Sequence, residues 1–413
     1  MRLLAKLACH WNVVLGLMAV MSIPACEGSS DRLRVECTPR FTAASADVPS
    51  GYRSVISNHL VGASFDGSAL AGGCSALLFD RDGRPGDFSA SDQYRWTASM
   101  GSQSLEDAID VYGISADGTT IIGAARVSPN PSGTRAPFEG ARWTQGSGKL
   151  AFDKLPNYAY SLPTDLSADG SVVVGILATY DPFELDALSR SFRWTREAGM
   201  IEVGPLPLGI GAHAEFVSAD GRVVVGLLSG DPPGASSPPR GTFVWTEGTE
   251  MLVLNELGAR AVNADGTAVV GYSLLGDNGA MLWTAASGVS SIGSLPGDGS
   301  AQGVAVSADG TIVAGISRAG TQPGADRVFR WTKSTGMIDV ADGIAFSVAR
   351  VCMSSNGAIV VSSDAVSGYS VIWDQVRGAR RRPLPEFLCV TGDGKHGIQY
   401  FAQGQSVSVG PLP

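Results

Sequence analysis

The sequence predicts an all-β protein, a β-propeller of seven or eight four-stranded blades. An Asp-Gly or Asn-Gly pair returns every 37 to 52 residues, which is the spacing of propeller blades and solenoid repeats. One tryptophan follows each of the first seven pairs, and no long helical pattern of apolar residues is present. The pairs begin at Asp66, Asp117, Asp169, Asp220, Asp265, Asp309, Asn356 and Asp393, and the tryptophans are Trp96, Trp143, Trp194, Trp245, Trp283, Trp331 and Trp373.

The N-terminal residues 1–25 have the features of a cleaved export signal. Arg2 and Lys6 precede a short apolar run at 13–21, whereas a membrane-spanning helix requires about 20 apolar residues. Ala25 and Cys26 resemble the end of the bacterial lipoprotein signal, although Pro24 departs from that pattern. The resemblance implies that Cys26 is lipidated, that 26–31 is a tether, and that the protein is an envelope lipoprotein of the outer membrane or cell surface. Ordinary cleavage followed by secretion remains the alternative.

The charge balance argues against some partners. Without residues 1–25 the chain has 28 basic and 39 acidic residues, a net charge of −11. Such a chain is not expected to bind nucleic acid or to present a basic face to a membrane. We therefore expect membrane contact through the lipid anchor alone, and a monomer. Residues 32–413 are long for a single core, but an array of repeats grows by addition, so they form one propeller domain.

Each repeat supplies the strands of a blade. Apolar residues approach the Asp-Gly pair and β-branched residues leave it, as in 304–308 and 311–315, which predicts a hairpin because Gly accepts the positive φ of a tight turn. A third strand carries the tryptophan, as in Phe-Arg-Trp-Thr at 192–195, and a fourth follows at 199–203. The tryptophans are expected to pack between blades, with carbohydrate stacking as the alternative. Arg380, Arg381 and Arg382 are expected in a solvated connection.

The last unit, 383–413, has an Asp-Gly turn but no tryptophan, and it offers three strands: 386–391, 397–403 and 406–410. The segment 32–37, in which Leu33 and Val35 alternate with polar residues, is able to supply the fourth strand and close the ring. Closure removes the exposed edges of an open stack. Eight blades are therefore favoured over seven.

The combined motif resembles a known bacterial repeat. Its elements are A-x-x-V-S-A-D-G-x-x-V-V-G, then F-R-W-T, then G-M-x-x-L, and they recur in order over about 54–390. This order is similar to the extracellular HAF repeats, named for a His-Ala-Phe tripeptide that is not intact here. The resemblance implies secretion and a β-propeller, and it implies no settled activity.

Four cysteines remain after Cys9 and Cys26 are set aside, and an even number in an exported protein favours disulfides. Cys352 and Cys389 each lie four residues before an Asn-Gly or Asp-Gly turn, so they occupy equivalent positions in consecutive repeats. We expect them to form a disulfide if their strands are innermost, with Cys37 and Cys74 as the second pair. Two buried free thiols are the alternative.

No catalytic motif is apparent. The sequence lacks G-x-S-x-G, H-E-x-x-H and a Walker loop, and outside residues 1–25 it has three isolated histidines, His59, His213 and His396. We therefore assign no catalytic residue and expect no cofactor. One acidic loop with alternate carboxylates, Asp80, Asp82 and Asp87, leaves a calcium site open, with a solvated hairpin loop as the alternative.

Variable loops suggest where a ligand would bind. The segments after the second strand of several repeats, 126–140, 179–191 and 229–241, are long and rich in Pro. Variable loops on a constant scaffold commonly carry binding specificity, and Phe138, Tyr180 and Phe183 are their aromatic residues. The sequence thus favours a binding module for a protein or glycan ligand. A structural scaffold in envelope assembly and a polysaccharide-degrading enzyme with paired carboxylates are the alternatives.

Overall fold

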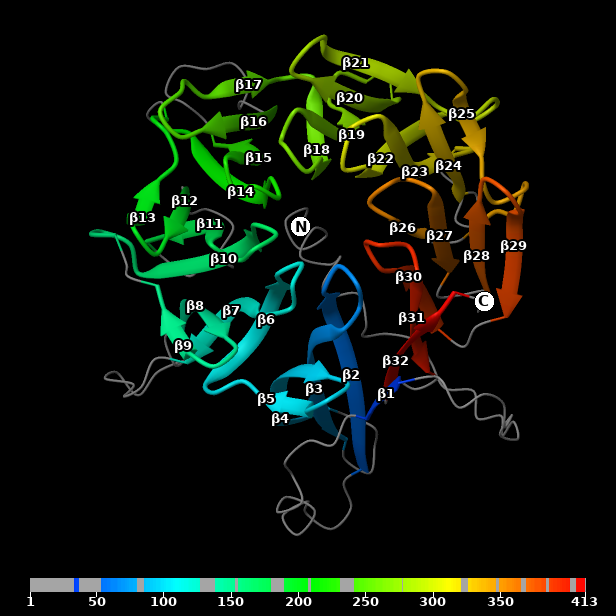
Figure 1. Cartoon of the computed structure of the whole chain (residues 1–413). Coiled ribbons are helices and arrows are strands. Elements are labelled where there is room, and N and C mark those ends of the chain that lie inside the picture. Colours follow the sequence, from blue (N-terminus) through cyan, green and yellow to red (C-terminus); the bar gives the residue numbers. More distant parts are fainter. Residues whose placement is uncertain are drawn as a thin grey trace.

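The computed structural model is a ring of eight antiparallel four-stranded sheets around a central axis (Figure 1). It describes residues 33–36, 53–79, 85–126, 138–152, 155–179, 189–206, 209–230, 241–276, 278–320, 326–346, 349–364, 369–383, 386–401 and 406–412. Within these ranges the regular structure consists of strands, and no helix is long and apolar enough to span a membrane. The all-β propeller is therefore confirmed, with eight blades.

The first four blades follow the order of the chain. Blade 1 contains β2 (Arg53–Ala63), β3 (Ala69–Phe79), β4 (Pro85–Thr97) and β5 (Gly101–Ser104). Blade 2 contains β6 (Ala108–Ile114), β7 (Thr120–Arg126), β8 (Phe138–Thr144) and β9 (Gly148–Ala151). Blade 3 contains β10 (Tyr160–Leu166), β11 (Val172–Ala178), β12 (Arg190–Thr195) and β13 (Gly199–Glu202), and blade 4 contains β14 (Gly211–Val217), β15 (Val223–Ser229), β16 (Gly241–Thr246) and β17 (Leu252–Leu254).

The remaining blades continue around the ring. Blade 5 contains β18 (Leu257–Val262), β19 (Ala268–Ser273), β20 (Ala280–Thr284) and β21 (Gly288–Gly293), and blade 6 contains β22 (Ser300–Val306), β23 (Ile312–Arg318), β24 (Asp326–Thr332) and β25 (Gly336–Asp339). Blade 7 contains β26 (Ala349–Met353), β27 (Ile359–Asp364), β28 (Tyr369–Asp374) and β29 (Gly378–Pro383). Blade 8 contains β30 (Glu386–Val390), β31 (His396–Phe401), β32 (Ser406–Pro411) and, from the start of the chain, β1 (Leu33–Glu36).

Blade 8 joins the two ends of the chain. β1 runs antiparallel to β32, with Leu33 opposite Val409 and Glu36 opposite Ser406. The prediction that 32–37 supplies the missing strand is confirmed. The expected connection at Arg380 to Arg382 was wrong, because these residues lie in β29, where Arg380 is opposite Ile372 in the neighbouring β28.

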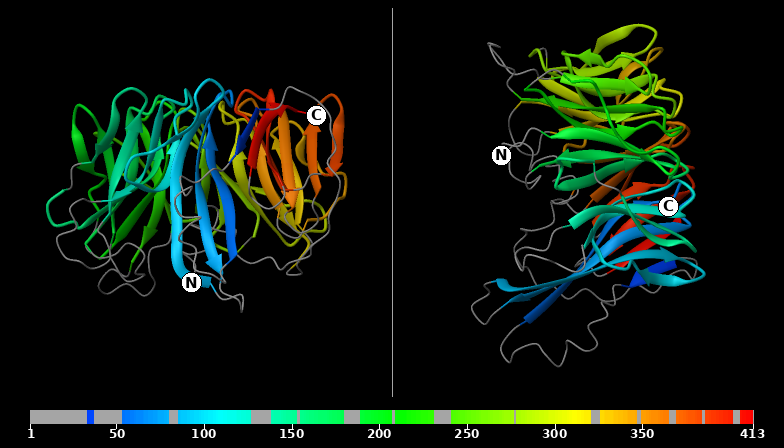
Figure 2. Two further views of the ribbon diagram at one scale, coloured as in Figure 1. Left: turned by 90° about the horizontal axis from the view of Figure 1, so that it is seen from below. Right: turned by 90° about the vertical axis from the view of Figure 1, so that its left-hand side faces the viewer.

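The first strand of each blade lies nearest the axis and the last lies at the rim, and the strands run between the two ends of the ring (Figure 2). The Asp-Gly turns all lie at one end, because each of them follows a first strand. Antiparallel order then places the ends of the second strands at the opposite end of the ring.

The Asp-Gly turns share one set of hydrogen bonds. In blade 3 the Ser167 hydroxyl donates to Asp169 Oδ1 at 2.7 Å and accepts from the Val172 N–H at 2.9 Å, while the Ser171 N–H donates to Asp169 Oδ1 at 2.9 Å. All eight turns repeat this arrangement, with Asn263 and Thr391 replacing serine in two of them. Burial tends to raise the pKa of Asp169, but the hydrogen bonds from Ser171 and Ser167 outweigh it and lower that pKa.

The glycine of each turn has two roles. Gly170 has a φ of +67°, which disfavours any residue with a side chain. A Cβ atom there would also lie 2.6 Å from the Thr120 Cβ of the preceding blade. Neighbouring blades therefore approach closely at this end of the ring.

A continuous circle of backbone hydrogen bonds joins the blades at these turns. In blades 1 to 7, the residue before the Asp or Asn donates its N–H to the carbonyl oxygen of its counterpart in the next blade. The bonds are Phe65 to Ala116 (2.7 Å), Ala116 to Ala168 (2.8 Å), Ala168 to Ala219 (2.9 Å), Ala219 to Ala264 (2.8 Å), Ala264 to Ala308 (3.3 Å), Ala308 to Ser355 (2.7 Å) and Ser355 to Gly392 (2.9 Å). The Asp393 N–H closes the circle on the Phe65 carbonyl at 3.1 Å. We call this the axial hydrogen-bond ring.

Aromatic and arginine side chains fill the gaps between blades. Trp194 is 4% exposed and its ring centroid lies 4.9 Å from that of Phe152, which belongs to the connection after blade 2. The Arg142 guanidinium of blade 2 lies 5.4 Å from the centroid of the Trp194 ring. The arginine of the Phe-Arg-Trp-Thr strand also reaches the next turn, since Arg330 Nε donates to the Gly357 carbonyl at 3.1 Å. Where this arginine is present, as at Arg95, Arg193 and Arg330, the motif links its blade to the next turn.

Replacing Trp194 with Ala should lower the free energy of unfolding by about 3 to 5 kcal/mol, because the substitution leaves a cavity between blades 2 and 3. Denaturant titration followed by circular dichroism measures this loss. The exposed Arg196 is the control, and Arg196→Ala should cost less than about 0.5 kcal/mol. A cost under about 1 kcal/mol for Trp194→Ala would contradict the packing role.

Candidate functional site

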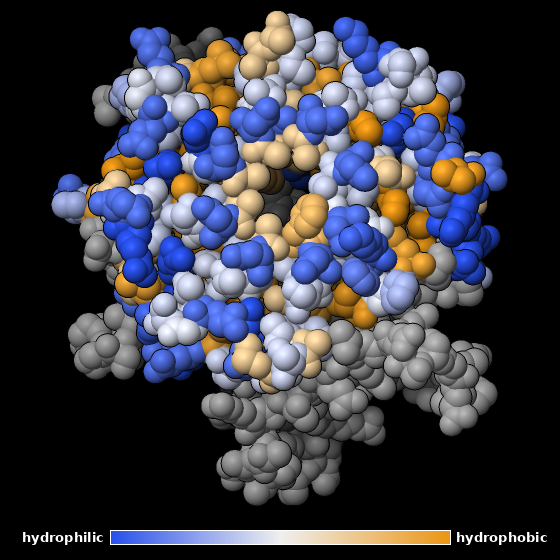
Figure 3. Space-filling view, viewed as in Figure 1, coloured by the Kyte–Doolittle hydropathy of each residue, from blue (hydrophilic) through white to orange (hydrophobic). Residues whose placement is uncertain are grey.

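A cavity on the axis is the main candidate site. It has a volume of about 620 Å³, and the first strands of every blade except blade 6 contribute to its wall. Figure 3 shows the hollow at the centre of the ring, with mostly weakly apolar residues around it. The size lies in the range of small-molecule pockets, which are about 300 to 1,000 Å³.

The mouth of the cavity is bordered by the axial hydrogen-bond ring. Small residues occupy seven of these eight positions, and Phe65 of blade 1 is the large one. Its side chain is 46% exposed and packs beside Gly392 of blade 8, where a Cβ atom would lie 2.4 Å from the phenyl ring. The small residue in blade 8 therefore makes room for the aromatic ring, which lies beside the entrance.

Asp165 in β10 is one of two charged residues among the described residues that line the cavity. Its Oδ1 accepts a hydrogen bond from the Leu166 N–H, and its Oδ2 accepts one from the Val217 N–H of blade 4, both at 2.9 Å. Protein surrounds the carboxyl group while part of the residue stays open to the cavity. Burial raises the pKa of Asp165 to about 7, although the two hydrogen bonds oppose this shift.

Arg350 in β26 is the other charged residue of the wall, and it is exposed there. Blades 3 and 7 are four positions apart in a ring of eight. Asp165 and Arg350 therefore project from opposite sides of the axis.

A missing β-bulge explains why blade 7 presents Arg350. In β10, Pro163 is opposite Gly175 and Asp165 is opposite Val174, so Thr164 is an extra residue. The bulge turns the position before it toward the neighbouring blade, and three counterparts of Pro163 are buried there, at 2% exposure or less. They are Val111, Ala214 and Ala259. The same register shift occurs in the first strands of blades 1 to 6.

In β26 the register is continuous, with Arg350, Val351 and Cys352 opposite Ser363, Ser362 and Val361. Side chains alternate along a regular strand, so Arg350 and Cys352 face the same side. Because Cys352 lines the cavity, Arg350 does so as well.

The residue opposite the bulge predicts from the sequence which blades have a bulge of this kind and which blade lacks it. A Cβ atom on Gly175 of β11 would lie 2.2 Å from the Leu162 carbonyl and 2.7 Å from the Phe192 ring, so the bulge requires glycine at this position. Blade 7 has Ser362 at the equivalent place. Loss of that glycine accompanies loss of the bulge.

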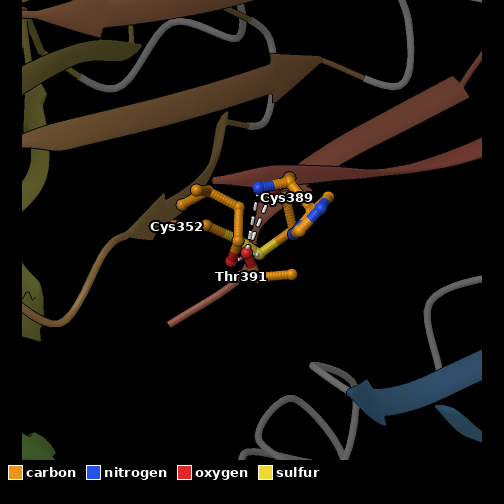
Figure 4. The surroundings of a disulfide bond; sticks show 5 residues. Cys352, Cys389 and Thr391 are labelled. Carbon is orange, nitrogen blue, oxygen red and sulfur yellow. Dashed lines mark hydrogen bonds between the residues drawn. A yellow bond between two sulfur atoms is a disulfide. The ribbon is translucent and has the colours of Figure 1, made fainter. Parts of the chain in front are cut away.

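Cys352 and Cys389 form a disulfide in the cavity wall, with Cα atoms 5.4 Å apart (Figure 4). The bond joins the first strands of blades 7 and 8, which are innermost as the predicted pairing requires. Asp165 occupies the equivalent position in blade 3, four residues before its own turn Asp. This one position therefore supplies both the disulfide and the carboxyl group.

Most of the residues predicted from sequence to form sites lie outside the part of the chain whose side chains are described. Those outside the described positions are Cys26, Cys37, Asp80, Asp82, Tyr180 and Phe183, and for Cys74, Asp87 and Phe138 only the backbone is described. Within the described part of the chain, no three His, Cys, Asp or Glu residues are grouped to hold a metal ion. The second disulfide, between Cys37 and Cys74, the calcium site and the binding role of the aromatic loop residues therefore stay predictions.

One histidine has a notable partner. His213 Nε2 forms a hydrogen bond with the Ser189 hydroxyl, a pairing also found between a nucleophile and its base. Ser189 is 5% exposed, and its carbonyl oxygen accepts from the Ala212 N–H of blade 4. A buried hydroxyl cannot readily attack a substrate, so we interpret this pair as a link between blades 3 and 4.

Comparisons with known proteins address the fold. No protein-family profile and no curated protein matches the sequence. A structure from a study of two prolyl endopeptidases aligns with a TM-score of 0.51 and 11% identity over 83% of this chain, which spans about half (54%) of that one. The β-propeller domain of the Trilobed protease from Pyrococcus furiosus gives 0.46 and 13% over 82% and 97% of the two chains, and TolB from Acinetobacter baumannii gives 0.37 and 12% over 87% and 80%. At these identities the similarity shows a β-propeller and no activity.

Asp165 should make stability depend on pH. Its pKa is raised from the ordinary 3.8 to about 7 in the folded protein, so it favours the folded state below about pH 4, and this contribution is lost as the pH rises to 7. The Asp165→Asn variant lacks that titration. Relative to wild type, it should therefore gain stability between pH 4 and 7.5, by at most about 4 kcal/mol.

Thermal unfolding of both proteins across this pH range tests the prediction. Asp169→Asn is the matched control, because the pKa of Asp169 is lowered and its difference from wild type should be constant between pH 5 and 8. A constant difference for Asp165→Asn would show that Asp165 does not titrate in this range.

Proposed function

We propose that this protein is an exported, lipid-anchored binding module that holds a small ligand in its axial cavity. The observation that carries the proposal is the cavity itself, about 620 Å³ in volume and enclosed by seven blades. Its wall is largely apolar with a few polar groups, the composition typical of ligand sites. The rigid ring would keep this site formed before the ligand arrives.

Two features support export. The first 25 residues have the charge and apolar run of an export signal. The disulfide between Cys352 and Cys389 suits an oxidising compartment, since disulfides rarely persist in the cytosol. The resemblance to extracellular HAF repeats agrees with this location.

The position of β1 is compatible with an anchor at Cys26. β1 is the outermost strand of blade 8, so the chain enters the ring at its rim and away from the axis. A lipid on Cys26 would therefore be joined to the ring through its rim. The variable segments that follow the second strands, with Phe138, Tyr180 and Phe183, remain a second proposed site for a protein or glycan partner.

Replacing Cys26 with Ala should move the protein from the membrane fraction to the soluble fraction, because the acyl chains would be lost. Cell fractionation and the mass of the mature N-terminus measure this. Cys9→Ala, within the signal, is the control and should leave the protein membrane-bound. A membrane-bound Cys26→Ala variant, together with a wild type that carries no acyl mass, would refute the anchor.

Purification from solubilised membranes, followed by mass spectrometry of bound small molecules and proteins, tests the binding function. We expect a small molecule that is released on unfolding. A stoichiometric protein partner with no small molecule would favour the envelope scaffold instead. Turnover of a polysaccharide by the purified protein would favour the enzyme.

A further inference from the structure

We propose that the axial cavity binds a small carboxylate with an apolar body, and that Arg350 recognises the carboxylate group. This inference rests on the proposed binding function and specifies the class of ligand.

The first observation is the placement of the cation. Arg350 is exposed in the cavity because β26 lacks the bulge before which the equivalent residues Val111, Ala214 and Ala259 are buried. The guanidinium group presents a planar fork of donors that matches a carboxylate. The protein has a formal net charge of −9, so the guanidinium group makes this side of the cavity favourable for an anion.

The second observation is the asymmetry of the wall. Asp165 lies in the opposite blade and disfavours an anionic group on its own side. A carboxylate is thus directed to blade 7. The rest of the lining is mainly small and apolar, with residues such as Ile114, Val217 and Val262, and suits the apolar part of a ligand.

The third observation is the aromatic side chain at the mouth. Phe65 interrupts a circle of small residues and leaves 46% of its surface exposed beside the entrance. An apolar body that extends from Arg350 toward the mouth would contact this ring. The ligand would then bury its apolar surface between the lining and Phe65.

Two sources supply this chemistry, a free carboxylic acid and the C-terminus of an apolar peptide. Isothermal titration of the full-length mature protein distinguishes them with 3-phenylpropionate, hexanoate and N-acetyl-Ala-Leu-Phe, each paired with its amide. We expect at least one acid to bind about 10-fold or more tightly than its amide, since a hydrogen bond to a charged group contributes that much. The member of the panel that binds identifies the source.

Substitutions then locate the interaction. Arg350→Met should reduce the affinity for the acid to that for the amide, and Arg350→Lys should give an intermediate affinity. Arg377→Met, at an exposed turn on the rim, is the matched control and should bind the acid as the wild type does. Thermal unfolding of each variant verifies that it is folded.

Equal binding of acids and amides, no saturable binding of any acid, or an acid preference that survives Arg350→Met would overturn this inference. The proposed function fails separately. If the membrane-purified protein carries a small molecule that has no carboxylate, the binding module stands and the assignment of Arg350 falls.

Discussion

The structure depends on the axial hydrogen-bond ring. Each Asp-Gly turn holds its own N–H and carbonyl groups toward the adjacent blades, and eight such turns close a circle with donor-to-acceptor distances of 2.7 to 3.3 Å. A single bond of this kind contributes only about 0.5 to 1.5 kcal/mol. The main effect of the eight hydrogen bonds is on the alignment of the blades, because they place every first strand at the same height around the axis. Small residues at these positions and glycine in the turns permit the close approach.

Departures from the repeat create the features of the cavity. Blades 1 to 6 share a bulge in the first strand, with a glycine opposite it that leaves space for a carbonyl group, whereas the shift in blade 8 lies at Phe387. Blade 7 has Ser362 instead and a regular strand, which brings Arg350 and Cys352 to the same face. Blade 3 has Asp165 where other blades have a small or apolar residue or cysteine. The constant elements build the scaffold, and the exceptions give the cavity its charge and its disulfide.

Much of the fold could be predicted from local patterns. The Asp-Gly pairs predict hairpins because the conformation of a tight turn depends on neighbouring residues alone. The alternation of apolar and polar residues in 32–37 predicted a strand that needed a partner. The candidate site was less accessible to sequence analysis, which directed attention to the variable loops. The axial cavity is formed by residues spread from Val61 to Ile398. Several of them belong to the repeated turn motif, but its two charged residues, Asp165 and Arg350, are exceptions to the repeat. Arg380 to Arg382 were misassigned because a run of charges resembles a loop, although an outer strand tolerates it equally well.

The sequence by itself determined the all-β class, the repeat unit, the turn chemistry and the equivalence of Cys352 and Cys389, since all of these follow from residue types at fixed short spacings. Only the tertiary structure decided that Asp165 and Arg350 share one cavity. Their opposition requires the number of blades, the closure of the ring by β1 and the absence of a bulge in β26. Each of these is a relation between distant segments, and such relations exist only after the blades have packed against one another.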